Sequence, residues 1–121
     1  MIRVGEYIRT PYGDIGRITN IPKHCKYYDD GFSLEHKFVG CGKNVMKKMK
    51  STPNIIDLVS VGDLMYIDIC PDDCGGIVVP RIAETLAEGQ EYFNKFKSGE
   101  YILKGIITKE KIMSNMYWVK E

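Results

Sequence analysis

Apolar and polar residues alternate along the first twenty residues of the chain, on both sides of a Pro-Tyr-Gly-Asp turn at residues 11–14. Strict alternation of this kind, with β-favouring residues, is typical of half-buried strands. Proline presets φ and glycine accepts positive φ, so the PYGD stretch suits a tight connection. We therefore predict a hairpin with strands over residues 6–10 and 15–21, the second of which Pro22 ends.

Similar patterns predict the remaining elements. A second hairpin tip is expected at Asp-Asp-Gly, residues 29–31. Apolar residues at helical spacing predict a helix over residues 81–97, with Ser98-Gly99 as its stop, and a single capped turn is expected over 108–112. Five further strands are expected over residues 33–39, 64–70, 77–79 (stopped by Pro80), 101–108 and 116–119.

A short phrase occurs twice in the chain, as Val4-Gly5-Glu6 and as Val61-Gly62-Asp63. We interpret each copy as a turn into a strand, where glycine relieves the backbone and the acid bonds a nearby N–H. The opening pattern also resembles that of small five-stranded barrels of the KOW and Src-homology (SH3) type. The sequence thus predicts a mainly β fold with a minor helix, forming a small SH3-like or KOW-like barrel. We expect the chain to form a single compact domain over residues 1–121. The alternative is two short all-β lobes, over residues 1–50 and 54–121, packed together.

Composition and charge narrow the function classes. The 121 residues suffice for an autonomous fold, and the net charge of +1 argues against strong nucleic-acid binding by phosphate neutralisation. No apolar run is long enough for a transmembrane helix, and the opening residues lack the apolar stretch of a secretory signal. We expect a cytoplasmic protein that does not bind membranes.

Four cysteines, at positions 25, 41, 70 and 74, raise the question of zinc. Cys70 and Cys74 are spaced within the range of zinc ligands. Cys25 and Cys41 do not form the second close pair that makes a zinc ribbon recognisable. Free thiols in a reducing compartment are the favoured interpretation, so no metal or other cofactor is predicted, and zinc binding by Cys70 and Cys74 stays open.

No catalytic motif stands out. The chain has no nucleophile elbow, no phosphate-binding loop with Lys-Ser/Thr and no dinucleotide fingerprint. His24 and His36 give no specific pairing with a cysteine. The acidic pairs at 29–30 and 72–73 lie in glycine-containing turns, and the basic stretch at 43–50 is typical of a solvated loop. The sequence predicts no catalytic residues and no enzyme.

Arginine and tyrosine side chains concentrate in the predicted β elements, although the chain has only four arginines. Both residue types are favoured at recognition surfaces because they combine large contact area with a polar end. Tyrosines on strands also commonly pack with only the hydroxyl exposed, so both interpretations stay open. The candidate ligand-binding residues are Tyr7, Arg9, Tyr12, Arg17, Tyr27, Tyr28, Tyr66 and Arg81.

Three segments of the chain, VGEYIRTPYGDIGRI, STPNIIDLVSVGDLMYIDI and GIITKEKIMSNMYWV, resemble small uncharacterised proteins of Firmicutes phages and prophages. Their Val-Gly-Asp/Glu-Tyr-Val and Ile-Val-Thr-Lys-Glu motifs match Val4–Tyr7 and Ile107–Glu110. Their Asn-Ile-Ile-Asp-Leu motif, followed by a second Val-Gly-Asp, matches Asn54–Leu58 and Val61–Asp63. The resemblance covers about half of the chain and is weaker over 22–50 and 71–99. It brings no catalytic motif with it.

This resemblance implies a phage or prophage accessory protein that acts by stoichiometric binding, in particular a host-defence antagonist. Such a protein would enclose a small signalling nucleotide or block a host protein through an edge strand or hairpin tip. A chain this small has little room for a pocket of 300 Å³ or more, so nucleotide binding would require a homo-oligomer. The alternatives are a structural or morphogenetic phage protein and, less favoured, a small enzyme dependent on Cys70, Cys74 or His36.

Overall fold

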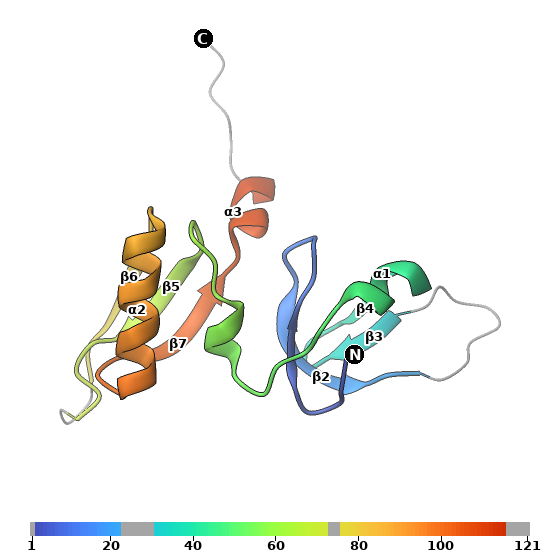
Figure 1. The fold of residues 1–121 in the computed structure, drawn as a ribbon, viewed down its shortest axis with the longest axis horizontal. Helices are drawn as coiled ribbons and strands as arrows, with labels where there is room; N and C mark the ends of the chain where they lie inside the picture. The colour runs from blue at the N-terminus through green and yellow to red at the C-terminus, as the bar shows by residue number, and fades with distance from the viewer. Residues whose placement is uncertain (1, 23–30, 73–75, 116–121) are drawn as a thin grey trace, which may run out of the picture. The chain divides into compact units, whose positions relative to one another are not determined.

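The computed structural model describes residues 2–22, 31–72 and 76–115. The chain divides into two sequence-contiguous units, Met1–Leu58 and Val59–Glu121. The fold is mainly β, with one antiparallel sheet in each unit and three short α-helices in the described part of the chain (Figure 1). Within residues 2–22, 31–72 and 76–115, none of the helices has the length and apolar composition that spanning a bilayer requires.

The first unit contains a four-stranded sheet in which each strand pairs with the next. Its strands are β1 (Tyr7–Arg9), β2 (Ile15–Asn20), β3 (Gly31–Leu34) and β4 (Phe38–Gly40). Helix α1 (Lys43–Lys48) and the 3-10 helix η1 (Ile55–Leu58) follow. An isolated antiparallel bridge joins Tyr7 to Thr52, so the chain returns to its first strand before η1 begins.

Strand alternation places the core of the first unit on one face of this sheet. Ile8, Ile18 and Phe32 are at most 1% exposed, and they pack with other apolar residues from β3, β4 and the segment after α1. The predicted hairpin at residues 6–21 is confirmed, since β1 and β2 pair around the turn. The predicted strand over 33–39 is wrong, because Glu35–Lys37 are three consecutive exposed polar residues that form a turn between β3 and β4.

The second unit contains a three-stranded sheet with β5 (Leu64–Asp68) at its centre. β6 (Val78–Ile82) and β7 (Ile102–Ile107) pair antiparallel on either side of β5. Helix α2 (Leu86–Ser98) lies across one face of the sheet (Figure 1), and α3 (Lys109–Asn115) follows β7. The core lies under α2, where Met65, Ile67 and Ala83 are at most 2% exposed.

Two boundaries in the second unit differ from the prediction. The strand expected to stop at Pro80 continues to Ile82, because β6 is an edge strand and an edge tolerates the missing N–H of proline. The helix expected from residue 81 therefore begins only at Leu86, where the Thr85 side chain accepts a hydrogen bond from the Glu88 N–H. Its predicted stop is confirmed, with Gly99 in the left-handed conformation at φ 81°.

The repeated Val-Gly-acidic phrase forms the same turn twice. Gly5 and Gly62 have φ of 91° and 95°, and the N–H groups of Glu6 and Asp63 each donate to the carbonyl three residues earlier. Positive φ at the third position is the requirement of a type II turn, which glycine meets without strain. The recurrence in sequence therefore reflects a shared backbone geometry at the start of each unit's sheet.

Two helices are longer or more regular than the sequence predicted. The capped turn expected over 108–112 is the beginning of the seven-residue helix α3. The basic stretch at 43–50, interpreted as a loop, contains α1. The strand expected over 116–119 and the hairpin tip at 29–30 lie outside the described residues.

Candidate binding surfaces

Three of the predicted ligand-binding residues meet on one face of the β1–β2 hairpin. Tyr7 and Arg17 are cross-strand partners, and Arg9 lies two residues beyond Tyr7 on the same strand. Side chains at such positions point to the same side of a sheet, opposite to the fully buried Ile8. The hairpin thus presents one tyrosine and two arginines on its outer face.

The two arginine side chains of this face make different contacts. The Arg9 guanidinium donates to the Leu58 carbonyl at 2.9 Å, and so links β1 to the end of η1. The Arg17 side chain lies 3.7 Å from the Glu35 carboxylate, and both side chains are about half exposed. An exposed pair at this distance contributes little to stability, so the Arg17 guanidinium is accessible to a ligand.

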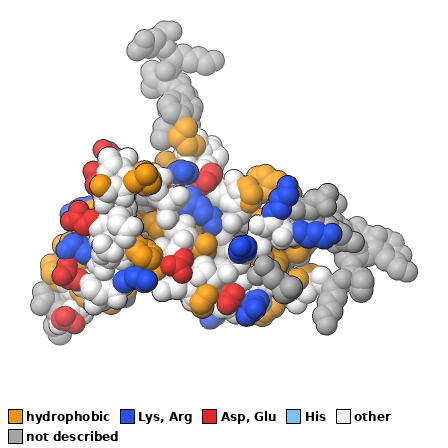
Figure 2. Space-filling model, in the orientation of Figure 1, with side chains coloured by type: hydrophobic (Ala, Val, Ile, Leu, Met, Phe, Trp, Pro, Cys, Tyr) orange, Lys and Arg blue, Asp and Glu red, His pale blue; other side chains and the backbone are white. Residues whose placement is uncertain are grey.

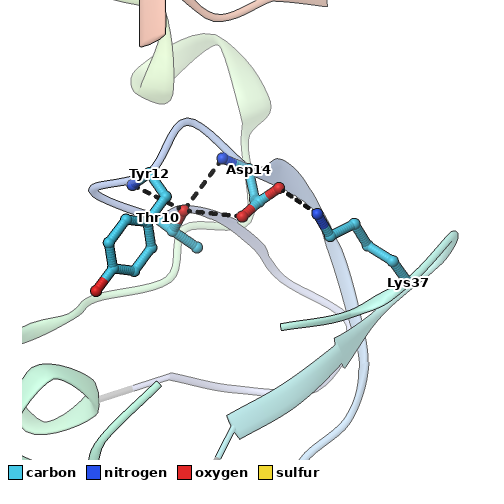
Figure 3. Close-up of polar contacts among 4 residues, drawn as sticks. All are labelled: Thr10, Tyr12, Asp14 and Lys37. Carbon is cyan, nitrogen blue, oxygen red and sulfur yellow. Dashed lines mark hydrogen bonds and ion pairs between the residues drawn. The ribbon is translucent and has the colours of Figure 1, made fainter. Parts of the chain in front are cut away.

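The tip of the hairpin is held by a compact polar cluster (Figure 3). The Thr10 hydroxyl oxygen accepts hydrogen bonds from the N–H groups of Tyr12 and Asp14 at 3.2 and 3.1 Å. The Asp14 carboxylate accepts from the Thr10 hydroxyl at 3.5 Å and forms an ion pair with Lys37 at 2.7 Å. Asp14 is buried and Lys37 comes from the β3–β4 turn, so the tip is fixed to its neighbouring hairpin.

Tyr12 stands at this tip and is 60% exposed. Its backbone is bound by Thr10, while its ring points away from Asp14 and Lys37 (Figure 3). A large aromatic side chain on a preorganised turn loses little conformational entropy when it enters a pocket on a partner. The hairpin tip, Tyr12 with the Thr10–Asp14–Lys37 cluster beneath it, is therefore a candidate recognition element.

The remaining predicted residues lie elsewhere. Tyr66 is on β5 and Arg81 is on β6, both in the second unit. They point to opposite faces of that sheet, since Arg81 pairs with the buried Met65 and Tyr66 pairs with Pro80. The Arg81 guanidinium donates to the adjacent Pro80 carbonyl at 2.8 Å. Tyr27 and Tyr28 lie outside the described residues.

The sheet of the second unit has an apolar face that α2 does not cover, which we call the open face. The register places it on the side opposite to Met65 and Ile67, where each row across the sheet contains one residue from β6, one from β5 and one from β7. Five of its large side chains are exposed, from 38% for Tyr66 to 53% for Val78, whereas Leu64 is partly buried. The open face consists of Leu64, Tyr66, Val78, Pro80, Ile82, Ile102 and Ile107.

Two polar or small positions complete the open face. Asp68 shares a row with Val78 and Ile102, but one oxygen of its carboxylate accepts from the backbone N–H groups of Cys70 and Ile77 at 3.0 and 3.1 Å. Gly105 lies opposite Tyr66, and a Cβ at this glycine would lie 3.6 Å from the tyrosine ring. The charge of Asp68 is thus engaged by the backbone, and the tyrosine packs beside a position without a side chain.

The opposite side of the second unit has a different character. Acidic, basic and apolar side chains are interspersed over the side that carries α2 (Figure 2). Beside the open face, by contrast, a shallow groove of about 610 Å³ continues from Ile82 along α3. Ile112 and Met113 line it together with Gly62, Lys109 and Glu110. The apolar surface of the second unit therefore extends from the sheet onto α3.

Sequence reasoning missed the open face. The apolar residues Val78, Pro80 and Ile82 alternate and indicate an apolar strand face. Because the predicted strand stopped at Pro80, Ile82 was not assigned to it. The residues considered for metal or thiol chemistry are described only in part. Cys41 is buried in the first unit and Cys70 lies in the second, and the described residues contain no group of three metal-ligating side chains. Cys25, Cys74 and His24 lie outside the described residues.

Comparisons of the chain with protein-family models, with curated proteins and with solved structures find no match.

Proposed function

We propose that the chain acts by stoichiometric binding of a protein partner, with the tip of the β1–β2 hairpin as the recognition element. The observation that carries this proposal is the exposed Tyr12 ring on a turn held by the buried Asp14 and its ion pair with Lys37. Interfaces owe much of their affinity to a few aromatic and arginine side chains on rigid elements. Arg17, on the same hairpin, supplies a second such side chain.

The resemblance to Firmicutes phage proteins favours a host protein as this partner, and a defence protein in particular. A phage accessory protein that blocks a host enzyme needs a binding surface and no catalytic centre. The near-neutral net charge of +1 disfavours mimicry of nucleic acid. The bridge between Tyr7 and Thr52 supports the finer expectation of an SH3-type barrel in the first unit, a scaffold on which loops and hairpin tips carry recognition.

A signalling nucleotide is the second candidate ligand. The observation that favours it is the cross-strand pair of Tyr7 and Arg17, a ring for a base and a planar cation for a phosphate. Arg17 is exposed and Tyr7 is partly exposed on this face of the hairpin, so enclosing a nucleotide there requires a second surface. In that case Arg17→Ala should abolish binding.

The test is native mass spectrometry of the protein isolated from a Firmicutes host, for the wild type and for Tyr12→Ala. A protein partner at fixed stoichiometry, lost in Tyr12→Ala and regained in Tyr12→Phe, is the expected result. Leu86→Ala is the matched control, because Leu86 is 84% exposed and lies on α2 in the second unit. A nucleotide mass that survives Tyr12→Ala would select the second candidate. A partner that binds Tyr12→Ala as well as the wild type would refute the hairpin assignment.

A further inference from the structure

The open face is an apolar surface without a cover among the described residues. A sheet normally buries at least one face, and α2 already buries the face that carries Met65 and Ile67. Most side chains of the open face are exposed, with Val78 at 53%, Ile82 at 45% and Ile102 at 41%. Together they present on the order of 500 Å² of apolar surface, as large as the largest patches of typical monomers.

The edges of this sheet are poorly suited to pairing with another strand. On β6, Pro80 removes a backbone donor from the middle of the strand. On β7, the register shifts between the partners of Tyr66 and Ile67, and the extra residue is the exposed Lys104. A bulge and a lysine on an edge are features that prevent strand addition. Association through this sheet therefore has to use the open face.

We propose that the open face is the interface of a homodimer, in which the sheets of two copies pack face to face around a two-fold axis. A surface that meets its own copy must be compatible with itself. The open face meets this condition because its side chains are apolar and its one carboxylate, Asp68, is already engaged by two backbone N–H groups. Neither copy would have to bury an unpaired charge.

The area sets the expected strength of the dimer. Stable interfaces bury about 800 Å² on each partner. The open face falls short of this value even together with the adjoining groove, where Met113 is 52% exposed. We therefore expect a reversible dimer with a dissociation constant on the order of micromolar. This interface lies in the second unit and involves no residue of the hairpin tip, so the two proposals can be tested with different variants.

Sedimentation velocity over about 1 to 300 μM protein tests the proposal. The wild type should shift from a mass of 13.8 kDa towards twice that value. Ile82→Lys places a charge on the open face and should weaken dimerisation at least tenfold. Leu86→Lys makes the same change at an exposed apolar residue of α2 and should leave dimerisation unchanged, as should Tyr12→Ala. Far-UV circular dichroism establishes that each variant is folded.

A second measurement does not depend on the stability of a variant with a charge on the sheet. A photo-reactive phenylalanine analogue in place of Tyr66 should cross-link two copies, whereas the same analogue in place of Tyr92 on α2 should not. A wild type that stays monomeric to 300 μM would overturn the proposal. So would cross-links from position 66 that form only within one chain, since another part of the same chain would then cover the face. Dimers that tolerate Ile82→Lys would place the interface elsewhere.

Discussion

Replacing Asp63 tests how the second unit is held together. Its carboxylate is fully buried, and its two oxygens accept from the N–H of Ser60 at 2.7 Å and from the N–H of Lys109 at 2.9 Å. The first bond closes the turn before β5, and the second fixes the start of α3, 46 residues further along the chain. One side chain thus connects the beginning and the end of the three-stranded sheet.

The magnitude follows from these two bonds. A hydrogen bond to a charged group contributes about 1.5–3 kcal/mol, so Asp63→Ala, which leaves both N–H groups without this acceptor, should cost about 3–6 kcal/mol. Asp63→Asn keeps one acceptor oxygen but turns its amide N–H towards the second backbone N–H. Its loss of unfolding free energy should be about half of that for Asp63→Ala. The predicted order of stability is wild type, then Asp63→Asn, then Asp63→Ala.

Urea unfolding followed by far-UV circular dichroism measures the free energies. In Asp63→Ala, peptides that contain Ser60 and Lys109 should exchange their amide hydrogens faster than in the wild type. The β1–β2 hairpin should keep its protection. Asp57→Asn is the matched control, because this exposed carboxylate accepts only a side-chain bond from Thr52 at 3.0 Å among the contacts described, and should change stability by about 0.5 kcal/mol or less. An Asp63→Ala protein with the unfolding midpoint of the wild type would refute the reasoning.

Two further predictions concern glycines. A Cβ at Gly31 would lie 2.2 Å from the Val39 carbonyl oxygen, so Gly31→Ala should lower the unfolding midpoint in urea strongly, whereas Gly42→Ala, with open space around it, should not. Gly5→Ala and Gly62→Ala each force an L side chain into positive φ and should cost about 1–2 kcal/mol in the same assay; a variant as stable as wild type would contradict the type II turn at that site.

The sequence predicted those features of the fold that depend on neighbouring residues. The first hairpin followed from alternation around the PYGD turn, and the stop of α2 followed from Gly99. The end of β6 did not follow, because whether Pro80 breaks a strand depends on the strand being at an edge, which is a property of the sheet. The assignment of Ile82 to an apolar face likewise requires the position of β6 in the sheet.

The candidate binding residues show a similar limit. Their composition indicated that arginine and tyrosine matter, and Tyr7, Arg9 and Arg17 do share one hairpin face. The bond from Arg9 to the Leu58 carbonyl spans 49 residues, so no local pattern reveals that this arginine also has a structural role. Likewise, the pairing of Asp14 with Lys37 depends on how two hairpins meet, which the turn sequence alone does not determine.

The division of the chain between Leu58 and Val59 has a consequence for synthesis in the cell. Every strand pair of the described sheets joins strands from the same side of this boundary. At a translation rate of about 5–20 residues per second, the first unit leaves the ribosome seconds before the second is complete. Its four strands pair with their sequence neighbours, so the nascent chain can bury Ile8, Ile18 and Phe32 before Met65 and Ile67 of the next unit compete for the same contacts.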